Sequence, residues 1–116
     1  MPYIKLETNA TVATEAQQAL CAKLSKLCAE TIGKPEQYVQ AAVVDGVAMV
    51  HGGAPGPAAF VDVRSIGGLS AKVCQALAEK VCATLKSALD VPGERVYLNF
   101  TDVSAAKWGH DGGTFG

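Results

Sequence analysis

The chain is built from two similar halves, and this internal repeat limits the folds open to it more than any other feature. A shift of 57 residues places the alternating segment YIKLET (3–8) on FVDVRS (60–65). The same shift aligns apolar residues and a proline in matching positions: Leu20 with Leu77, Leu24 with Val81, Ile32 with Leu89 and Pro35 with Pro92. Each half is therefore expected to form the same elements in the same order.

The apolar spacing within each half predicts a strand, a helix, a turn and a second strand. Apolar residues recur every three or four positions over 16–32 and over 73–89, which indicates two amphipathic helices. Pro35 and Pro92 follow them and cannot continue a helix. A right-handed βαβ unit has two parallel strands with the helix on one face. The predicted fold class is α/β: two pseudo-symmetric βαβ units that form a four-stranded mixed sheet with two helices on one face, in a single domain over residues 1–116.

Alternation along the strands assigns their side chains to two faces of this sheet. The apolar face, expected under the helices, contains Ile4, Leu6, Val39, Ala41, Val43, Val61, Val63, Val96, Leu98 and Phe100. The polar face contains Tyr3, Lys5, Glu7, Tyr38, Gln40, Asp62, Arg64, Tyr97 and Asn99. No helix remains to cover the polar face, so either solvent or neighbouring subunits cover it. Its aromatic residues favour an oligomer.

Charge and composition exclude several kinds of partner. The net charge of −1 gives no bulk attraction for nucleic acid, and no apolar run approaches the length of a membrane-spanning helix. The N-terminal segment alternates and lacks the apolar core of a secretory signal, which predicts a cytoplasmic protein. The cysteines of each predicted helix lie about two turns apart, roughly 10 Å or more, too far for a disulfide within a helix. We expect all four cysteines to be reduced.

Few residues are candidates for chemistry. His51 and His110 lie in glycine-rich segments with only Asp111 as a further possible ligand, so no metal and no cofactor are expected. Pro2 differs from them, because removal of Met1 would leave a secondary amine at the start of the first strand. An ordinary α-amino group has a pKa of about 8, and burial or a nearby cation would lower this pKa and make the amine a base at neutral pH. Position alone, however, favours no special role for Pro2.

Five segments of the sequence, taken together, bear on the role of Pro2. They are MPYIKLETNA (1–10), IGKPEQYV (32–39), RSIGGLS (64–70), RVYLNFTDV (95–103) and WGHDGGTFG (108–116). In order and spacing they resemble the macrophage migration inhibitory factor and D-dopachrome tautomerase family, over the whole chain. The resemblance implies a homotrimer with active sites at subunit interfaces and keto–enol tautomerase activity on a small aromatic keto acid such as phenylpyruvate, or on a dopachrome-like substrate.

The resemblance also implies roles for individual residues. Processed Pro2 would be the catalytic base, and Lys34 would bind the substrate carboxylate with help from the backbone at Ile66. Tyr97 and Asn99 would enter the site from the neighbouring subunit. An aromatic rim would be formed by Tyr38, Trp108 and Phe115.

Some features depart from the family pattern and leave alternatives open. Animal members carry a CxxC motif for thiol–disulfide chemistry, which Ala58-Ala59-Phe60-Val61 replaces here, so no such activity is expected. His110-Asp111-Gly112-Gly113 stands where W-N-x-S is common, which affects the pocket rim. The alternative to an enzyme is a cytokine-like interaction protein that binds a receptor and has a vestigial pocket, exported without a signal peptide as the family is known to be. A third interpretation is a related dehalogenase or decarboxylase, which would use additional arginines.

Overall fold

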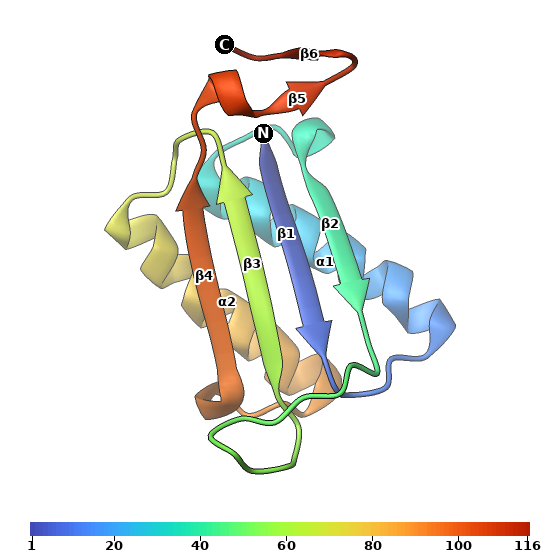
Figure 1. Cartoon of the computed structure of the whole chain (residues 1–116). Helices are drawn as coiled ribbons and strands as arrows, with labels where there is room; N and C mark the ends of the chain where they lie inside the picture. Colours follow the sequence, from blue (N-terminus) through green and yellow to red (C-terminus); the bar gives the residue numbers. More distant parts are fainter.

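The two halves fold into the two predicted βαβ units in the computed structural model, which describes residues 1–116 (Figure 1). The first unit consists of β1 (Pro2–Thr8), α1 (Thr14–Ile32) and β2 (Gln40–Val44). The second consists of β3 (Ala59–Ser65), α2 (Ala71–Leu89) and β4 (Val96–Asp102). The remaining elements are three 3₁₀ turns and two short tail strands: η1 (Glu36–Tyr38), η2 (Gly93–Arg95), η3 (Ala105–Lys107), β5 (Gly109–His110) and β6 (Gly113–Thr114).

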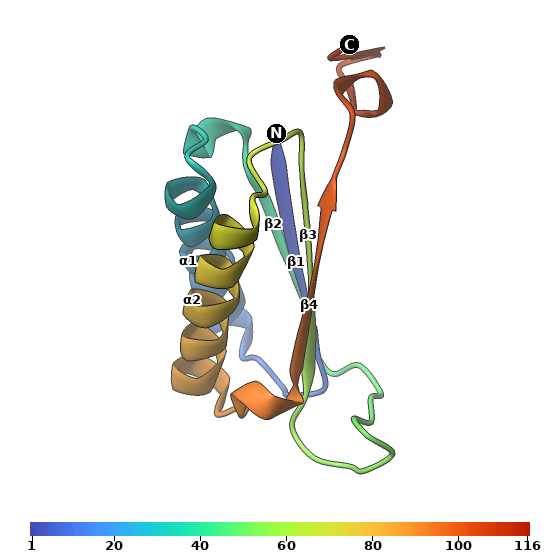
Figure 2. The same cartoon turned by 90° about the vertical axis from the view of Figure 1, so that its left-hand side faces the viewer.

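The four long strands form one mixed sheet in the order β2-β1-β3-β4, and both helices cover the same face of it (Figure 2). Strands within each unit are parallel, and the units join through antiparallel β1 and β3. In that central pair Pro2 lies opposite Ser65 and Thr8 lies opposite Ala59. The start of β1 therefore lies at the same end of the sheet as the end of β3.

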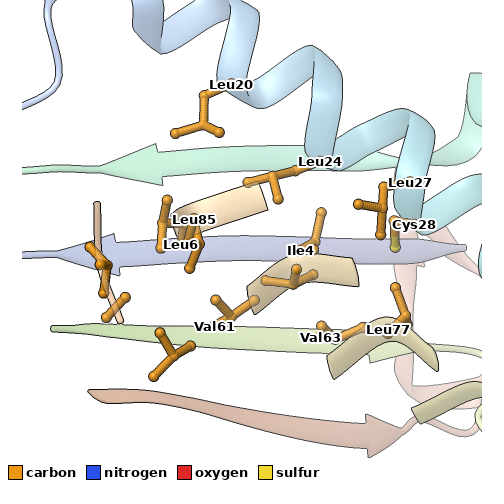
Figure 3. Packing of buried hydrophobic residues seen from close by; sticks show 14 of the residues in the cluster. Ile4, Leu6, Leu20, Leu24, Leu27, Cys28, Val61, Val63, Leu77 and Leu85 are labelled. Atoms are coloured by element: carbon orange, nitrogen blue, oxygen red, sulfur yellow. The ribbon is translucent and has the colours of Figure 1, made fainter. Parts of the chain in front are cut away.

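The apolar face of the sheet packs under the helices as predicted (Figure 3). Ile4, Leu6, Val61 and Val63 on the two central strands have no solvent exposure. They meet apolar side chains from both helices, among them Leu24, Leu77 and Leu85. Most predicted core residues of β2 and β4 are only partly buried, because these strands form the edges of the sheet, but Val96 at the start of β4 is buried. Burial of each fully enclosed aliphatic side chain contributes roughly 1.5–3 kcal/mol.

Both helices end where the sequence predicts, through left-handed residues. Gly33 ends α1 with φ +82°, and Asp90 ends α2 with φ +54°. At the start of α2 the Ser70 hydroxyl accepts a hydrogen bond from the backbone N–H of Val73, which satisfies one of the free donors of the first turn. No helix in the structure is long and apolar enough to cross a lipid bilayer, and all four cysteines are unpaired.

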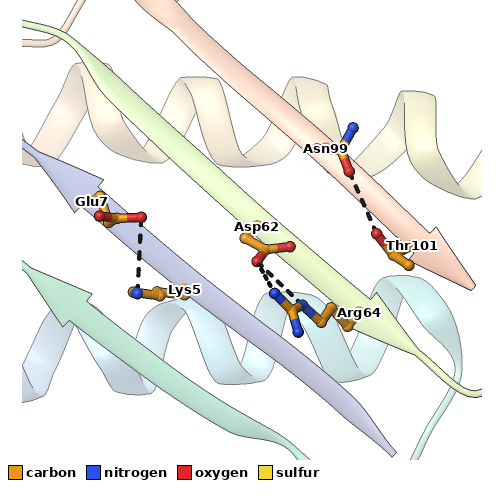
Figure 4. A network of polar contacts seen from close by, with 6 residues as sticks. All are labelled: Lys5, Glu7, Asp62, Arg64, Asn99 and Thr101. Atoms are coloured by element: carbon orange, nitrogen blue, oxygen red, sulfur yellow. Dashed lines mark hydrogen bonds and ion pairs between the residues drawn. The ribbon is translucent and has the colours of Figure 1, made fainter. Parts of the chain in front are cut away.

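The opposite face of the sheet carries polar side chains that pair along their own strands (Figure 4). Lys5 and Glu7 are 3.9 Å apart on β1, and Arg64 contacts Asp62 at 3.0 Å on β3. Such exposed pairs contribute little to stability. The assignment of Tyr38 to this face is wrong: Tyr38 lies in η1, since its N–H donates to the carbonyl of Pro35 (3.1 Å) and β2 begins only at Gln40.

Candidate functional site

A pocket of about 390 Å³ opens at the end of the sheet where the chain begins. Three separate segments form its walls: the first residues of the chain, the η1 turn and the C-terminal tail. These segments bring together Pro2, Tyr38, Trp108 and Phe115, which the sequence places far apart. Four of the predicted site residues therefore line one hollow within a single chain.

The antiparallel pairing of β1 and β3 determines which residues of β3 lie beside Pro2. Pro2 lies opposite Ser65, so Ile66 directly follows the strand position that faces Pro2. The Ser65 hydroxyl donates to the carbonyl of Gly67 (2.7 Å), and the N–H of Val103 donates to the carbonyl of Ser65 (2.9 Å). These hydrogen bonds fix the turn after β3. The backbone at Ile66 thus lies at the same sheet end as Pro2, as its predicted role requires.

Lys34 also lies at this end of the sheet. It follows Gly33, where α1 stops. A methyl group built on Gly68 would lie 3.6 Å from Cε of Lys34, so this side chain passes beside the turn that follows Ile66. Burial and the positive charge of Lys34 together lower the pKa of the amino group at Met1, and burial is the larger cause. A terminal amine at this position is therefore easier to keep neutral than an ordinary one.

Cys28 forms part of the apolar wall behind the first strand. Its side chain has no solvent exposure, and burial raises the pKa of its thiol to about 11. The thiol is therefore neutral at physiological pH and packs as a small apolar group. It supplies apolar surroundings for the terminal amine, not a nucleophile.

The C-terminal tail covers the mouth of the pocket and contributes a residue that the predicted site lacked. Residues Asp111 (φ +47°) and Gly112 (φ +80°) reverse the chain between β5 and β6. This turn brings the ring of His110 to 5.5 Å from the ring of Phe115, with the two planes only 12° apart. His110 belongs to the glycine-rich stretch that the sequence connects with the pocket rim. It is exposed, but it also lines the pocket beside Pro2.

The structure does not bring Tyr97 and Asn99 to this pocket within one chain. They lie opposite Phe60 and Asp62 of β3, whereas Pro2 lies opposite Ser65. Along β3, Ser65 lies five positions from Phe60, roughly 16 Å, and three positions from Asp62, roughly 10 Å. Tyr97 is 63% exposed on the helix-free face of the sheet. Within one chain, neither side chain lines the pocket at Pro2.

A larger hollow of about 490 Å³ lies between α1 and α2, on the other side of the molecule. Its walls are mostly small apolar residues such as Ala16, Ala83 and Ala88, with Lys23 as the one charged group. It holds no acid or base suited to proton transfer and none of the predicted site residues. The smaller pocket at Pro2 is therefore the better candidate for a functional site.

Comparison with known proteins agrees with this fold and with this order of segments. The family model "Macrophage migration inhibitory factor (MIF)" matches residues 1–116. A macrophage migration inhibitory factor homolog of Brugia malayi is 38% identical over 116 residues and covers 100% of both chains. The crystal structure of a homologue from Prochlorococcus marinus superimposes with a TM-score of 0.94 at 36% identity, over 98% of this chain and 99% of that one. A related protein from Entamoeba histolytica gives a TM-score of 0.91 at 32% identity, over 98% of both chains.

Proposed function

This chain belongs to the macrophage migration inhibitory factor family, and from that premise we propose that it interconverts the keto and enol forms of a small aromatic keto acid. Members of the family are tautomerase-type isomerases. The observation that carries the proposal is the placement of Pro2, which is buried at the start of β1 and lines a pocket with aromatic walls. Phenylpyruvate is the simplest substrate of this class, and dopachrome-like compounds share its planar ring and acid group.

The proposed base is the amine of Pro2 after removal of Met1. Burial and Lys34 lower the pKa of the amine at Met1, and we expect the same two causes to act on the amine of Pro2 once it becomes the terminus. The neutral amine removes a proton from the carbon beside the keto group. The electron pair of that C–H bond forms the enol double bond while the carbonyl π pair moves onto oxygen, and the ammonium of Pro2 gives the same proton to that oxygen, which restores the neutral amine. A base matched to the working pH accelerates such a step by about 10²–10⁴-fold.

The surrounding residues would bind and orient the substrate. Lys34 would pair with the carboxylate, and the backbone N–H at Ile66, at the same sheet end, would donate a hydrogen bond to it. Tyr38, Trp108 and Phe115 would enclose the aryl ring between η1 and the tail. Apolar walls with a few convergent polar groups are typical of sites for planar organic acids.

We propose that the complete site is shared between copies of the chain in a homotrimer. Family members are generally homo-oligomeric, and Tyr97 and Asn99 cannot reach Pro2 of their own chain. The helix-free face that carries them is uncovered in a single chain, with Tyr97 63% and Phe60 38% exposed. A neighbouring copy on this face would bury these rings and bring Tyr97 to the next pocket.

Neither arginine lines the pocket at Pro2, and both are engaged by other groups of the chain, which favours this reaction over dehalogenation or decarboxylation. Arg64 lines only an adjoining hollow of about 260 Å³. Arg64 pairs with Asp62 on the open face of the sheet. Arg95 donates hydrogen bonds to backbone carbonyls of the loop that joins the two halves. Neither leaves a free guanidinium beside Pro2 within the chain.

Kinetics of phenylpyruvate tautomerisation test the proposed base. We expect Pro2→Gly to lower kcat/KM by about 10²-fold, the lower end for loss of a tuned general base. Pro55→Gly, which removes an exposed proline from a distant loop, serves as the control and should keep wild-type activity. Equal activity of wild type and Pro2→Gly would contradict the proposal and favour the alternative, an interaction protein with a vestigial pocket.

Mixing two variants tests the shared site. Pro2→Gly and Tyr97→Ala each damage a different half of the pocket. When the two are unfolded and refolded together, some interfaces combine an intact Pro2 from one chain with an intact Tyr97 from the next. Activity above that of either variant is expected, and its absence would place both residues in independent roles.

A further inference from the structure

The loop that joins the two halves, residues 45–58, is anchored by several side chains from outside it, of which those of Arg95 and Asn9 make the most hydrogen bonds. Arg95 donates hydrogen bonds to four of its carbonyls, those of Pro57 (2.7 Å), Ala54 (3.0 Å), Gly56 (3.2 Å) and His51 (3.4 Å). Asn9 donates to the carbonyl of Gly56 (2.8 Å) and accepts from the N–H of Ala58 (2.9 Å). A loop rich in glycine and proline thereby acquires a fixed course at the far end of the sheet (Figure 1).

This anchored loop places the ring of His51 next to the ring of Tyr97. His51 and Ala54 exchange two backbone hydrogen bonds of 3.1 Å across a tight turn at Gly52 (φ +59°) and Gly53 (φ +75°). The imidazole ring lies 4.7 Å from the phenol ring of Tyr97, with the planes inclined by 42°. Tyr97 follows Arg95 by two residues, so the guanidinium that holds the loop and the ring that the loop contacts belong to one short segment.

The contact with His51 restrains a ring that is largely exposed. Tyr97 is 63% exposed, and no hydrogen bond of its hydroxyl to another group of the chain fixes its orientation. Its one close aromatic neighbour is His51. Fixing such a side chain before a ligand arrives removes the ordering cost from the binding step.

We propose that His51 is a positioning residue, whose imidazole holds the phenol ring of Tyr97 in the orientation that completes the pocket of the neighbouring subunit. The inference rests on the proposed function, because Tyr97 can contact a substrate only if the pocket is shared between chains. His51 itself touches no reacting atom. Its effect is therefore on substrate affinity and much less on the proton transfer.

Steady-state kinetics with phenylpyruvate test this assignment. An aromatic contact and the ordering of one side chain correspond to about 2- to 10-fold in affinity. We expect His51→Ala to raise KM by about that factor while kcat stays within about twofold. His51→Phe keeps a ring against Tyr97 and should restore KM to nearly the wild-type value. Val50→Ala changes a neighbouring loop side chain that is 65% exposed and should leave KM unchanged.

A double-mutant cycle separates positioning of Tyr97 from a general effect on folding. In a Tyr97→Ala background, His51→Ala is expected to have no further effect on KM. The inference is overturned if His51→Ala has the wild-type KM, if its effect persists without Tyr97, or if His51→Phe is as impaired as His51→Ala. Dissociation of the assembly by His51→Ala, measured by sedimentation, would also overturn it, since His51 would then be an interface residue.

The same assays keep this inference distinct from the proposed function. Wild-type activity that depends on Pro2 but ignores His51 would refute the positioning role alone. Wild-type protein without activity, or with activity indifferent to Pro2, would refute the proposed function and this inference together.

Discussion

Replacing Gly68 with alanine is expected to destabilise the protein more than the same change at the neighbouring Gly67. Both residues have left-handed backbone angles, with φ +79° at Gly68 and +72° at Gly67, a conformation that costs an alanine about 1–2 kcal/mol. A methyl group at Gly67 meets nothing within 4 Å, whereas a methyl group at Gly68 would lie 2.8 Å from Cγ2 of Ile32. Ile32 is 9% exposed and belongs to the core, so it can retreat only by displacing its neighbours. Such overpacking costs a further 1–3 kcal/mol or so.

We therefore expect Gly67→Ala to lower the free energy of unfolding by about 1–2 kcal/mol and Gly68→Ala to lower it by about 2–5 kcal/mol. Urea titration followed by circular dichroism measures both, at one protein concentration because the stability of an oligomer depends on concentration. Gly68→Ala should also raise KM. Lys34 follows Ile32 by only two residues, so a displacement of Ile32 also moves Lys34. Equal losses of stability in the two variants would refute the reasoning, because they would show that Ile32 yields without cost.

Further predictions concern charge and chain reversal. Lys34→Ala removes a charge that lowers the pKa of the terminal amine, so the acidic limb of the pH profile of kcat/KM should move to higher pH; an unmoved limb would contradict this role. The Cys28 thiol, with a pKa raised to about 11, should resist iodoacetamide at pH 8 in the native protein, as mapped by mass spectrometry. Because its pKa is higher in the folded than in the unfolded state, stability should fall as pH rises from 9 toward 11. Asp90→Gly relieves a left-handed residue (φ +54°) and loses only an exposed contact with Lys86, so its thermal midpoint should rise; a lower midpoint would show that the ion pair outweighs the strain.

The fold was predictable from the sequence because each half has to bury one face of its strands. The spacing of Leu20, Leu24 and Ile32 and its repetition 57 residues later are compatible with few arrangements other than paired βαβ units. The repeat alone did not decide whether β1 and β3 run parallel or antiparallel, since either pairing buries the same faces. Tyr38 was misplaced for a local reason: Pro35 starts a 3₁₀ turn that alternation along the strand does not reveal.

Sequence patterns predicted the residues of the site less well than they predicted the fold. Pro2, Tyr38, Trp108 and Phe115 line one pocket, but no periodicity connects them, and only the resemblance to a family grouped them. Catalytic sites combine residues from distant segments, whereas periodicity reports on one segment at a time.

His110 illustrates a signal that was present and not used. Asp111-Gly112 is a typical two-residue turn pair between strands, and such a hairpin pairs His110 with Gly113, as the structure has it. The same reversal directs the tail back so that His110 and Phe115 stack at the pocket. The resemblance already connected this stretch with the pocket rim, and reading the glycine-rich tail as a hairpin would have added the contact between His110 and Phe115.

The central claim is that Pro2 carries a free amine that is neutral at physiological pH. Its most direct test is a pH titration of the ¹⁵N resonance of the Pro2 nitrogen in protein labelled with ¹⁵N-proline, after intact-mass measurement of the same sample. We expect a mass without Met1 and a nitrogen that titrates below the ordinary α-amino pKa of about 8. A retained Met1, which would make this nitrogen an amide that does not titrate, or a pKa at or above that ordinary value, would contradict it.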